Sequence, residues 1–341
     1  MADAIGRVRT LVISILAYSV FAFLSGLAQS YEQLLVARTL LGLGFGGEWT
    51  VGALLMAEVA QPAQRGRMQG AFASAYAVGW GLAAGAYAAL FSALPAAVAW
   101  RVLLWLGVVP ALLTLWIRLR LQDPPVYLAA HARRGRPHPP ETLAAIFGPA
   151  LLRVTAAGFL LSAGALCGKY VIAIWLPTYL EDTLHLAVAA VGLQQAAVID
   201  GAFAGYVLGG YVNDWLGRRG TFLVFAIASG PATALYVALP ANLGALLGLV
   251  GFGLGFCQAA VVGGLGAYLA ELYPTRVRGS GQGFCYSLGR GVSGVLPGGV
   301  GLLAATTGLG PALALSAAVY ALCLVALRFL PETRGAELTA R

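Results

Sequence analysis

The sequence is poor in charged residues and rich in apolar ones. Only 10% of its 341 residues are Asp, Glu, Lys or Arg, and 60% are hydrophobic. Soluble globular domains have about 25% charged residues, so this chain has too few charges to cover a water-facing surface. Apolar runs of about 20 residues, the length that a helix needs to cross a bilayer, recur from end to end. This composition argues against a soluble enzyme, a nucleic-acid-binding domain and a disordered protein.

Cysteine is also scarce, with four copies in the whole chain. Cys167, Cys257, Cys285 and Cys323 are scattered through apolar segments and show neither metal-ligand spacing nor a disulfide framework. The sequence contains no HExxH, GxSxG, CxxC or P-loop motif. We therefore expect no enzymatic activity, no metal and no cofactor.

The net charge of +8 comes from short arginine clusters between the apolar runs. The clusters lie at 7–9, 65–67, 118–120, 133–136, 218–219 and 276–278. The loops that alternate with them carry no Lys or Arg. Because cytoplasmic loops of membrane proteins are enriched in these residues, we expect the arginine clusters and both termini in the cytoplasm. The positive charge is therefore explained by membrane topology, and we expect no nucleic-acid partner.

Ten membrane-spanning helices are expected from the apolar runs. They lie at roughly 10–29, 34–58, 69–93, 101–119, 154–178, 188–212, 220–240, 243–270, 281–305 and 311–329. The stretch 122–148 holds five prolines, and prolines at this density are not expected to continue a helix. The chain thus divides into a four-span domain at 1–121, a cytoplasmic linker at 122–150 and a six-span domain at 151–341.

Two segments of the first half recur in the second half. Residues 2–10 (ADAIGRVRT) resemble 213–221 (NDWLGRRGT), and residues 57–70 (AEVAQPAQRGRMQG) resemble 270–283 (AELYPTRVRGSGQG). Such parallel repeats place two halves side by side about an axis along the membrane normal. In the second half two spans precede the repeated loop, whereas only Met1 precedes ADAIGR. We hypothesise from this symmetry that the chain lacks the first two spans of a six-plus-six transporter.

These repeated loops resemble the signature loop of the major facilitator superfamily. The span ARTLLGLGFGGEWTVGALLMAEV is similar to its fourth-helix motif. WLPTYL, ELYPTRVRGSGQGF and SLGRG resemble its metabolite:proton symporters, especially the sialate/lactate:proton branch. The resemblance implies an all-α membrane protein with two pseudo-symmetric helical bundles and ten of twelve helices present. It also implies a central cavity that opens alternately to either side, proton-driven transport and a bacterial inner-membrane location.

Five charged residues stand out within the expected spans, where each costs about 2.5–3.5 kcal/mol at the bilayer centre. They are Arg38, Glu48, Lys169, Asp200 and Arg290. From a rise of about 1.5 Å per helical residue, all except Arg38 are expected near mid-depth, where transporter sites lie. We expect Asp200 and Arg290 to interact directly or through the substrate. The alternative is an ion pair that only joins two helices.

Proton coupling is expected at Glu48, Arg38 and Asp200. Partial burial favours the protonated form of Glu48, so this residue can bind and release a proton as access alternates. Alternatively, Glu48 is hydrogen-bonded to the backbone of its glycine-rich surroundings. Arg38 resembles the motif arginine linked to proton coupling in the superfamily, or it extends along the helix to the nearby membrane surface.

Substrate binding is expected at mid-depth as well. Lys169 is the only lysine of the chain, and together with Arg290 it favours an anionic substrate over a neutral one. The alternative for Lys169 is a side chain that reaches the membrane surface. The predicted binding residues are Lys169, Arg290, Asp200, Tyr170, Trp175, Gln194 and Gln258.

The repeated loops predict a cytoplasmic gate. Its expected members are Asp3, Gly6, Arg7, Glu58, Arg65, Asp214, Gly217, Arg218, Glu271, Arg276 and Arg278. We expect Glu58 to pair with Arg65, and Glu271 to pair with Arg276 and Arg278. The alternative is that these arginines only fix the topology.

The sequence therefore favours a proton-coupled symporter of a small organic anion, which we expect to be a carboxylate. Its expected partners are the lipid bilayer, protons and the substrate, and the fold usually needs no second subunit. Two alternatives stay open, namely a carrier of sugars or neutral metabolites and a membrane protein that no longer transports.

Overall fold

The computed structural model of this chain describes residues 2–109, 111–134 and 139–338, and most of them are helical. Nine helical segments of these ranges are long and apolar enough to cross a membrane. They are α2 (Arg7–Leu27), α3 (Tyr31–Val59), α4 (Arg65–Ala93), α9 (Leu152–Thr178), α10 (Val188–Trp215), α11 (Arg218–Ala238), α12 with α13 (Gly244–Gly263, Leu265–Leu272), α14 (Arg278–Thr307) and α15 with α16 (Leu309–Ser316, Ala321–Leu327). Each overlaps one expected span.

The remaining expected span, 101–119, is divided into shorter pieces. Helix α5 (Ala96–Trp105) continues into a 3-10 turn, and α6 (Ala111–Arg120) follows. Helix α5 begins five residues earlier than the predicted span. Its start is set by Pro95, whose carbonyl accepts the backbone N–H groups of Val98 and Ala99. Proline is compatible with a helix start because the first N–H groups of a helix have no partner within it.

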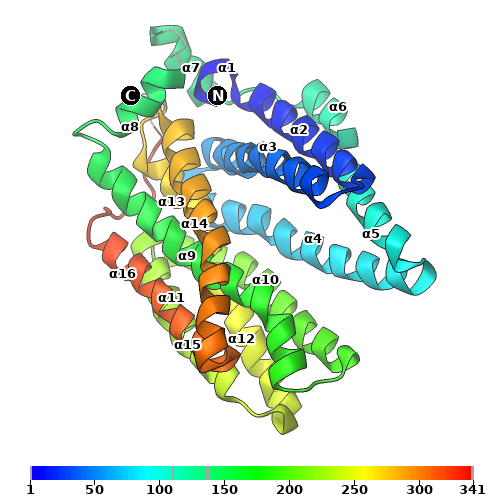
Figure 1. Cartoon of the computed structure of the whole chain (residues 1–341). Coiled ribbons are helices and arrows are strands. Elements are labelled where there is room, and N and C mark those ends of the chain that lie inside the picture. Colours follow the sequence, from blue (N-terminus) through cyan, green and yellow to red (C-terminus); the bar gives the residue numbers. More distant parts are fainter. Residues whose placement is uncertain (1, 110, 135–138, 339–341) are drawn as a thin grey trace.

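The helices form two bundles that meet at one end and diverge at the other (Figure 1). Helices α2–α6 make the first bundle, and α9–α16 make the second. Both chain ends lie at the joined end, near the short helix α1 (Ala2–Ile5). Between the bundles, α4 packs against α10 and α3 packs against α14. This arrangement gives the molecule an opening between the two bundles at the far end.

Close packing within the second bundle depends on glycines at every fourth position of α10. A Cβ on Gly201, Gly205 or Gly209 would overlap the backbone of α12 at Phe252, Phe256 and Ala260, respectively. Small residues let two membrane helices approach in this way, which supports van der Waals contact where no hydrophobic effect operates between apolar helices. These three glycines therefore form a helix-packing ridge on α10.

The proline-rich stretch 122–148 is partly helical. This stretch contains α7 (Pro125–Arg134) and α8 (Pro139–Ile146). Each helix begins at a proline, and proline is accepted in the first turn because no intrahelical hydrogen bond needs its missing N–H. Prolines of this stretch therefore mark the points where two short helices start.

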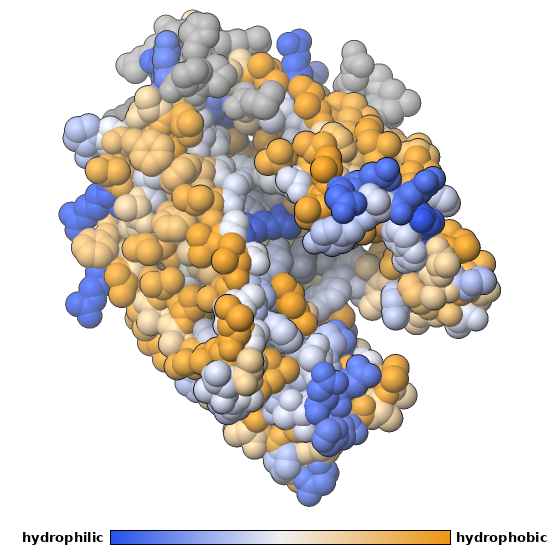
Figure 2. All heavy atoms as spheres, in the orientation of Figure 1, coloured by the Kyte–Doolittle hydropathy of each residue, from blue (hydrophilic) through white to orange (hydrophobic). Residues whose placement is uncertain are grey.

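The outer faces of both bundles are apolar (Figure 2). Leu82, Val188, Leu193 and Leu302 are each more than 70% exposed, as side chains in contact with lipid would be. Between the bundles Figure 2 shows a hollow lined by paler, less apolar residues. The chain is therefore a multi-pass membrane protein with a less apolar hollow between its bundles.

Candidate functional site

A buried network of charged side chains joins the two bundles at the closed end. Arg7 contacts Asp3 at 2.6 Å and Glu58 at 3.2 Å, and Glu58 in turn contacts Arg278 of α14 at 3.0 Å. The Asp3 carboxylate also accepts the backbone N–H groups of Gly279 and Ser280, at 3.0 and 2.7 Å. It thus lies at the N-terminus of α14, where the helix dipole favours negative charge. We call this cluster the first latch.

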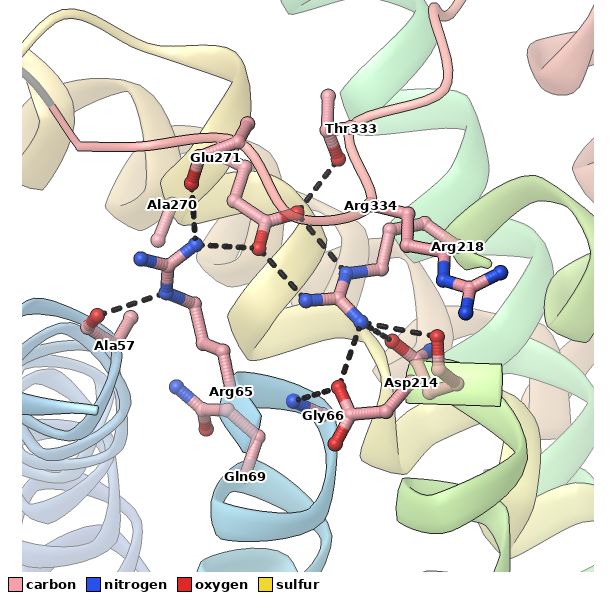
Figure 3. Close-up of polar contacts among 12 residues, drawn as sticks. Ala57, Arg65, Gly66, Gln69, Asp214, Arg218, Ala270, Glu271, Thr333 and Arg334 are labelled. Carbon is pink, nitrogen blue, oxygen red and sulfur yellow. Dashed lines mark hydrogen bonds and ion pairs between the residues drawn. The ribbon is translucent and has the colours of Figure 1, made fainter. Parts of the chain in front are cut away.

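A second latch repeats the same contacts with the two halves exchanged (Figure 3). Arg218 contacts Asp214 at 3.1 Å and Glu271 at 2.8 Å, and Glu271 contacts Arg65 of α4 at 2.7 Å. Asp214 accepts the N–H groups of Gly66 and Arg67 at the start of α4, at 2.7 and 2.9 Å. The two latches are thus related by a pseudo-twofold axis between the bundles.

Each latch is held in place by local backbone geometry. Gly6 and Gly217 precede α2 and α11 with φ values of 111° and 87°, a region that side chains rarely adopt. Their carbonyl oxygens accept the hydroxyl groups of Thr10 and Thr221. The buried arginine and glutamate side chains are each paired and hydrogen-bonded, which a charge needs in order to remain buried. The predicted gate members are therefore brought together, apart from Arg276.

The partners within the latches differ from those that we expected. Glu58 does not pair with Arg65, and Glu271 does not pair with Arg278. Each arginine crosses to the glutamate of the other half. The reason is that the pseudo-twofold axis brings the two repeated loops face to face, so the nearest opposite charge belongs to the other copy. Arg276 is 47% exposed and lies 4.0 Å from the exposed Glu141, which is a weak contact outside both latches.

Two acidic residues that sequence analysis missed complete the latches. Asp123 follows the last span of the first half and accepts the backbone N–H of Val8 at 2.9 Å. Glu332 follows the last span of the second half and accepts the N–H groups of Arg218 and Arg219, both at 2.9 Å. The two acids stand at equivalent positions after the repeats. Extending the comparison of the halves beyond the loops would have found them.

The C-terminal segment passes from one bundle to the other at this end. The Thr333 hydroxyl donates a hydrogen bond to Glu271 at 2.6 Å. The carbonyl oxygen of Ala336 accepts a hydrogen bond from the Arg65 guanidinium group at 2.9 Å. Burial alone would raise the pKa of Glu332, but the backbone N–H groups that it accepts lower this pKa below its ordinary value. The segment therefore adds contacts to the second latch.

Deeper between the bundles lies a cavity of about 240 Å³. Its lining includes Glu48 of α3, Tyr76 of α4, Lys169 and Tyr170 of α9, and Tyr206 of α10. Trp49 and Tyr286, from opposite bundles, stack at its edge with ring centroids 3.4 Å apart. The cavity thus combines one carboxylate and one ammonium group with aromatic faces.

Lys169 is buried, with only 7% of the residue exposed, so it does not extend to the membrane surface. Its ammonium group donates to the Tyr206 hydroxyl and lies 3.9 Å from the centroid of the Tyr76 ring. The ion pairs of the described residues do not include Lys169. A buried cation held by tyrosines in this way is available to an anion that enters the cavity.

Arg290 of α14 lies beside the same cavity. Its guanidinium group stands 4.2 Å from the centroid of the Phe45 ring and 5.8 Å from that of Tyr170. Both rings line the cavity that Glu48 and Lys169 also line. The structure therefore brings together four of the predicted residues, namely Glu48, Lys169, Tyr170 and Arg290.

The other predicted residues lie apart from this group. Asp200 and Arg38 are both exposed, and the described ion pairs include neither of them. The expected direct contact between Asp200 and Arg290 is therefore wrong. Similar depth on two helices was the basis for that expectation, but depth does not fix the direction in which a side chain points around its helix.

Three predicted polar residues have structural surroundings of their own. The indole N–H of Trp175 donates to the carbonyl oxygen of Pro297 at 2.9 Å. The amide of Gln194 donates to the carbonyl oxygen of Gly244 at 3.0 Å. The Nε2 of Gln258 is buried without a hydrogen-bond partner and borders a small cavity that also contacts Lys169. Of these three side chains, Gln258 has a free donor near the central cavity.

A wider groove of about 620 Å³ lies between α2, α3 and α14. Gly42 of α3 lines it, and no heavy atom lies within 4 Å of a Cβ built on that residue. Its repeat equivalent, Gly255, is instead packed against the Val198 carbonyl of α10. The groove in the first bundle therefore occupies the place that α10 occupies in the second bundle.

Comparisons with known proteins agree with this architecture. Residues 158–341 match the family model described as "Major Facilitator Superfamily", and residues 1–138 match "Sugar (and other) transporter". The probable 4-methylmuconolactone transporter of Cupriavidus pinatubonensis is 38% identical over 98% of this chain and 77% of its own length. The cis,cis-muconate transport protein of Acinetobacter baylyi is 29% identical over 94% of this chain and 77% of its own. The proton:xylose symporter XylE superposes with a TM-score of 0.77 at 19% identity, over 99% of this chain and 83% of that chain.

Proposed function

This chain belongs to the major facilitator superfamily of membrane transporters, and within it we propose a symporter that moves a small organic carboxylate together with protons. The observation that carries the proposal is the pair of cations at the central cavity. Lys169 and Arg290 are both in contact with aromatic rings, and the described ion pairs include neither of them. A carboxylate entering the cavity would supply the missing negative charge.

The aromatic lining suits a flat, partly apolar substrate. Trp49, Tyr76 and Tyr170 offer ring faces to a bound molecule, while the cations hold its carboxylate. Two relatives are named as transporters of 4-methylmuconolactone and cis,cis-muconate, which are unsaturated carboxylates. Their names support this substrate class for the present chain.

Transport would proceed by alternating access. Both latches hold the bundles together at one end, which we assign to the cytoplasm from its arginine content. Opening of the latches and closure of the far end would expose the central cavity to the cytoplasm. We propose that Glu48, which lines the cavity, carries the proton. Both termini then lie in the cytoplasm of a bacterial cell, with the protein in the inner membrane.

We also propose that residues 1–121 form an incomplete bundle, connected through 122–150 to a complete one at 151–341. The open groove beside Gly42 supports this, because the equivalent Gly255 is covered by α10. Two further helices, equivalent to α9 and α10, would fill the groove. If a version of the protein that carries two such helices melts no higher than the present chain, the groove has another role. We further propose that the chain belongs to the sialate/lactate:proton branch, which the segments WLPTYL, ELYPTRVRGSGQGF and SLGRG support.

Uptake by proteoliposomes tests the substrate class. The carboxylates 4-methylmuconolactone, cis,cis-muconate and nicotinate would be compared with the neutral myo-inositol, each with and without an inward proton gradient. We expect saturable uptake of at least one carboxylate that the gradient increases. Saturable uptake of myo-inositol alone would support a neutral-metabolite carrier, and binding without flux would identify a protein that no longer transports.

A further inference from the structure

Helix α14 faces the first bundle along one side, from the first latch to the central cavity. Arg278, Gln282 and Tyr286 follow one another at intervals of four residues, which places them on the same face of this helix. Arg278 contacts Glu58 of α3, and the Tyr286 ring stacks on Trp49 of α3. Gln282 therefore lies between two contacts that cross from one bundle to the other.

The Gln282 side chain is buried without a hydrogen-bond partner. The residue is 0% exposed, and among the described residues neither its Nε2 nor its Oε1 has a partner. A glutamine amide offers two N–H donors and an oxygen with two lone pairs, so none of its hydrogen-bonding capacity is used here. A polar group that leaves water without finding a partner destabilises the conformation in which it is buried. Gln282 therefore destabilises the form in which the two bundles are joined at the latches.

The equivalent residue of the first half, Gln69, is buried but paired. The repeated segments 57–70 and 270–283 align Gln69 of α4 with Gln282 of α14. Gln69 is 1% exposed, and its Nε2 donates a hydrogen bond to the carbonyl oxygen of Ala53 in α3. Its Oε1 faces the second bundle, where a Cβ built on Gly266 would lie 2.6 Å away. Two equivalent glutamines at the contact between the bundles thus differ in whether the joined form satisfies them.

Opening of the latches would change the surroundings of Gln282. Separation of α14 from α3 at this end would admit water, which can both donate hydrogen bonds to an amide and accept them from it. The unpaired amide therefore raises the free energy of the closed form relative to the open one. The two latches act in the opposite direction, because ion pairs such as Arg278–Glu58 join residues of different bundles.

We propose that Gln282 opposes closure of the latch end and keeps the closed and open forms of the carrier near balance, so that the bundles can separate in each transport cycle. The inference rests on the alternating access of the proposed function but not on its substrate. An unpaired buried amide shifts such an equilibrium about tenfold or more. Gln69 has no such effect, since it is paired in the closed form. A carrier with an apolar side chain at position 282 stays closed for longer and transports more slowly.

Melting temperatures of the purified protein in detergent give the first test. Gln282→Met is compared with Gln69→Met, its matched control at the equivalent position. Methionine is a flexible, unbranched side chain that needs no hydrogen bond, so it removes an unpaired amide at 282 and a paired one at 69. Gln282→Met should therefore raise the melting temperature, and Gln69→Met should lower it.

A second readout follows the opening of the latch end itself. Asp214→Asn weakens the second latch, and in this background a cysteine introduced by Ala73→Cys in the cavity lining reports access from the latch side. Its rate of maleimide labelling in membrane vesicles measures that access. Adding Gln282→Met should slow the labelling about tenfold or more, because the closed form no longer contains the unpaired amide. Adding Gln69→Met should not slow it.

Three results would overturn the proposal. A Gln282→Met variant that melts below the wild type would show that the amide has a partner in the closed form, such as a bound water. Failure of both Gln282→Met and Gln282→Leu to fold would have the same meaning. A higher melting temperature with unchanged labelling would show that the amide destabilises both forms equally. Absence of labelling in the Asp214→Asn background itself would instead contradict the alternating access of the proposed function, and this inference with it.

Discussion

Asp3 and Asp214 hold equivalent places on the two sides of the pseudo-twofold axis. Asp3 accepts two backbone N–H groups at the start of α14, and Asp214 accepts two at the start of α4. Each carboxylate thus neutralises the positive end of a helix in the opposite bundle. Each also pairs with an arginine four residues later on its own side. The same arrangement therefore joins the two bundles at two equivalent places at this end of the molecule.

Replacing Asp214 by Asn should loosen the second latch. The substitution removes the charge from the ion pair with Arg218 and from two charge-assisted hydrogen bonds, each worth about 1.5–3 kcal/mol. We expect Ala73→Cys, introduced at a buried position in the cavity lining, to be labelled about tenfold or more faster by a maleimide added at the latch side. The labelling rate in membrane vesicles measures this, with the cysteine content otherwise unchanged.

Asp182→Asn serves as the control for that experiment. Asp182 is exposed in the turn after α9 and has no ion pair among those of the described residues. In this control variant the cysteine introduced by Ala73→Cys should be labelled at the background rate. Equal labelling of the Asp214 and Asp182 variants would show that the latch does not hold this end closed.

Glu332 gives the C-terminal contact a definite pH dependence. Its pKa in the folded protein lies below the value of about 4.3 for an unfolded chain. The stabilisation is therefore fully present above the unfolded pKa and is lost as the pH falls through the folded one. Glu332→Gln should lower the melting temperature at pH 7, and the difference from wild type should shrink below about pH 4. Glu337→Gln, at an exposed position of the same segment, is the control. A constant difference at all pH values would show that the charge of Glu332 is not the cause.

The latch members could be predicted because the sequence contains them twice. The repeat alone indicates that these residues have a role, because Asp3 recurs as Asp214 and Arg7 recurs as Arg218. Their partners could not be predicted in the same way. The repeat shows that Glu58 and Glu271 are equivalent. Only the packing of the two halves shows that each glutamate contacts an arginine of the opposite half.

The central cavity shows a similar limit. Apolar runs located Glu48, Lys169 and Arg290 at mid-depth, because an ionisable residue in a span is conspicuous. The direction of a side chain around its helix depends on which neighbour packs against which face. That is why Asp200 was wrongly placed beside Arg290. Tyr76 and Tyr206, which hold Lys169, were missed because tyrosines in membrane helices carry no distinctive sequence signal.

Lys169→Met should weaken carboxylate binding with little effect on the fold. The variant keeps a long side chain among Tyr76 and Tyr206 but removes the ammonium group that would pair with the substrate. A hydrogen bond to a charged group contributes about 1.5–3 kcal/mol, so KM should rise about 10-fold to 100-fold. Initial rates of carboxylate uptake in proteoliposomes measure this change. Arg9→Gln, which removes an exposed cation, should leave KM unaltered. An unchanged KM in the Lys169 variant would show that this cation does not bind substrate.

The contact between α10 and α12 permits a stability test that needs no transport. A Cβ on Gly205 would overlap the backbone of Phe256, and backbone atoms cannot move aside as a flexible side chain can. Gly205→Ala should therefore push the two helices apart at a cost of about 1–3 kcal/mol or more and lower the melting temperature in detergent. Gly253→Ala is the matched control, since no heavy atom lies within 4 Å of the added methyl group. Alanine favours a helix over glycine by about 1 kcal/mol, so the control should melt at the wild-type temperature or slightly above it. If both variants melted alike, the packing of α10 on α12 would not require glycine, and the small-residue ridge would have to be explained by another contact.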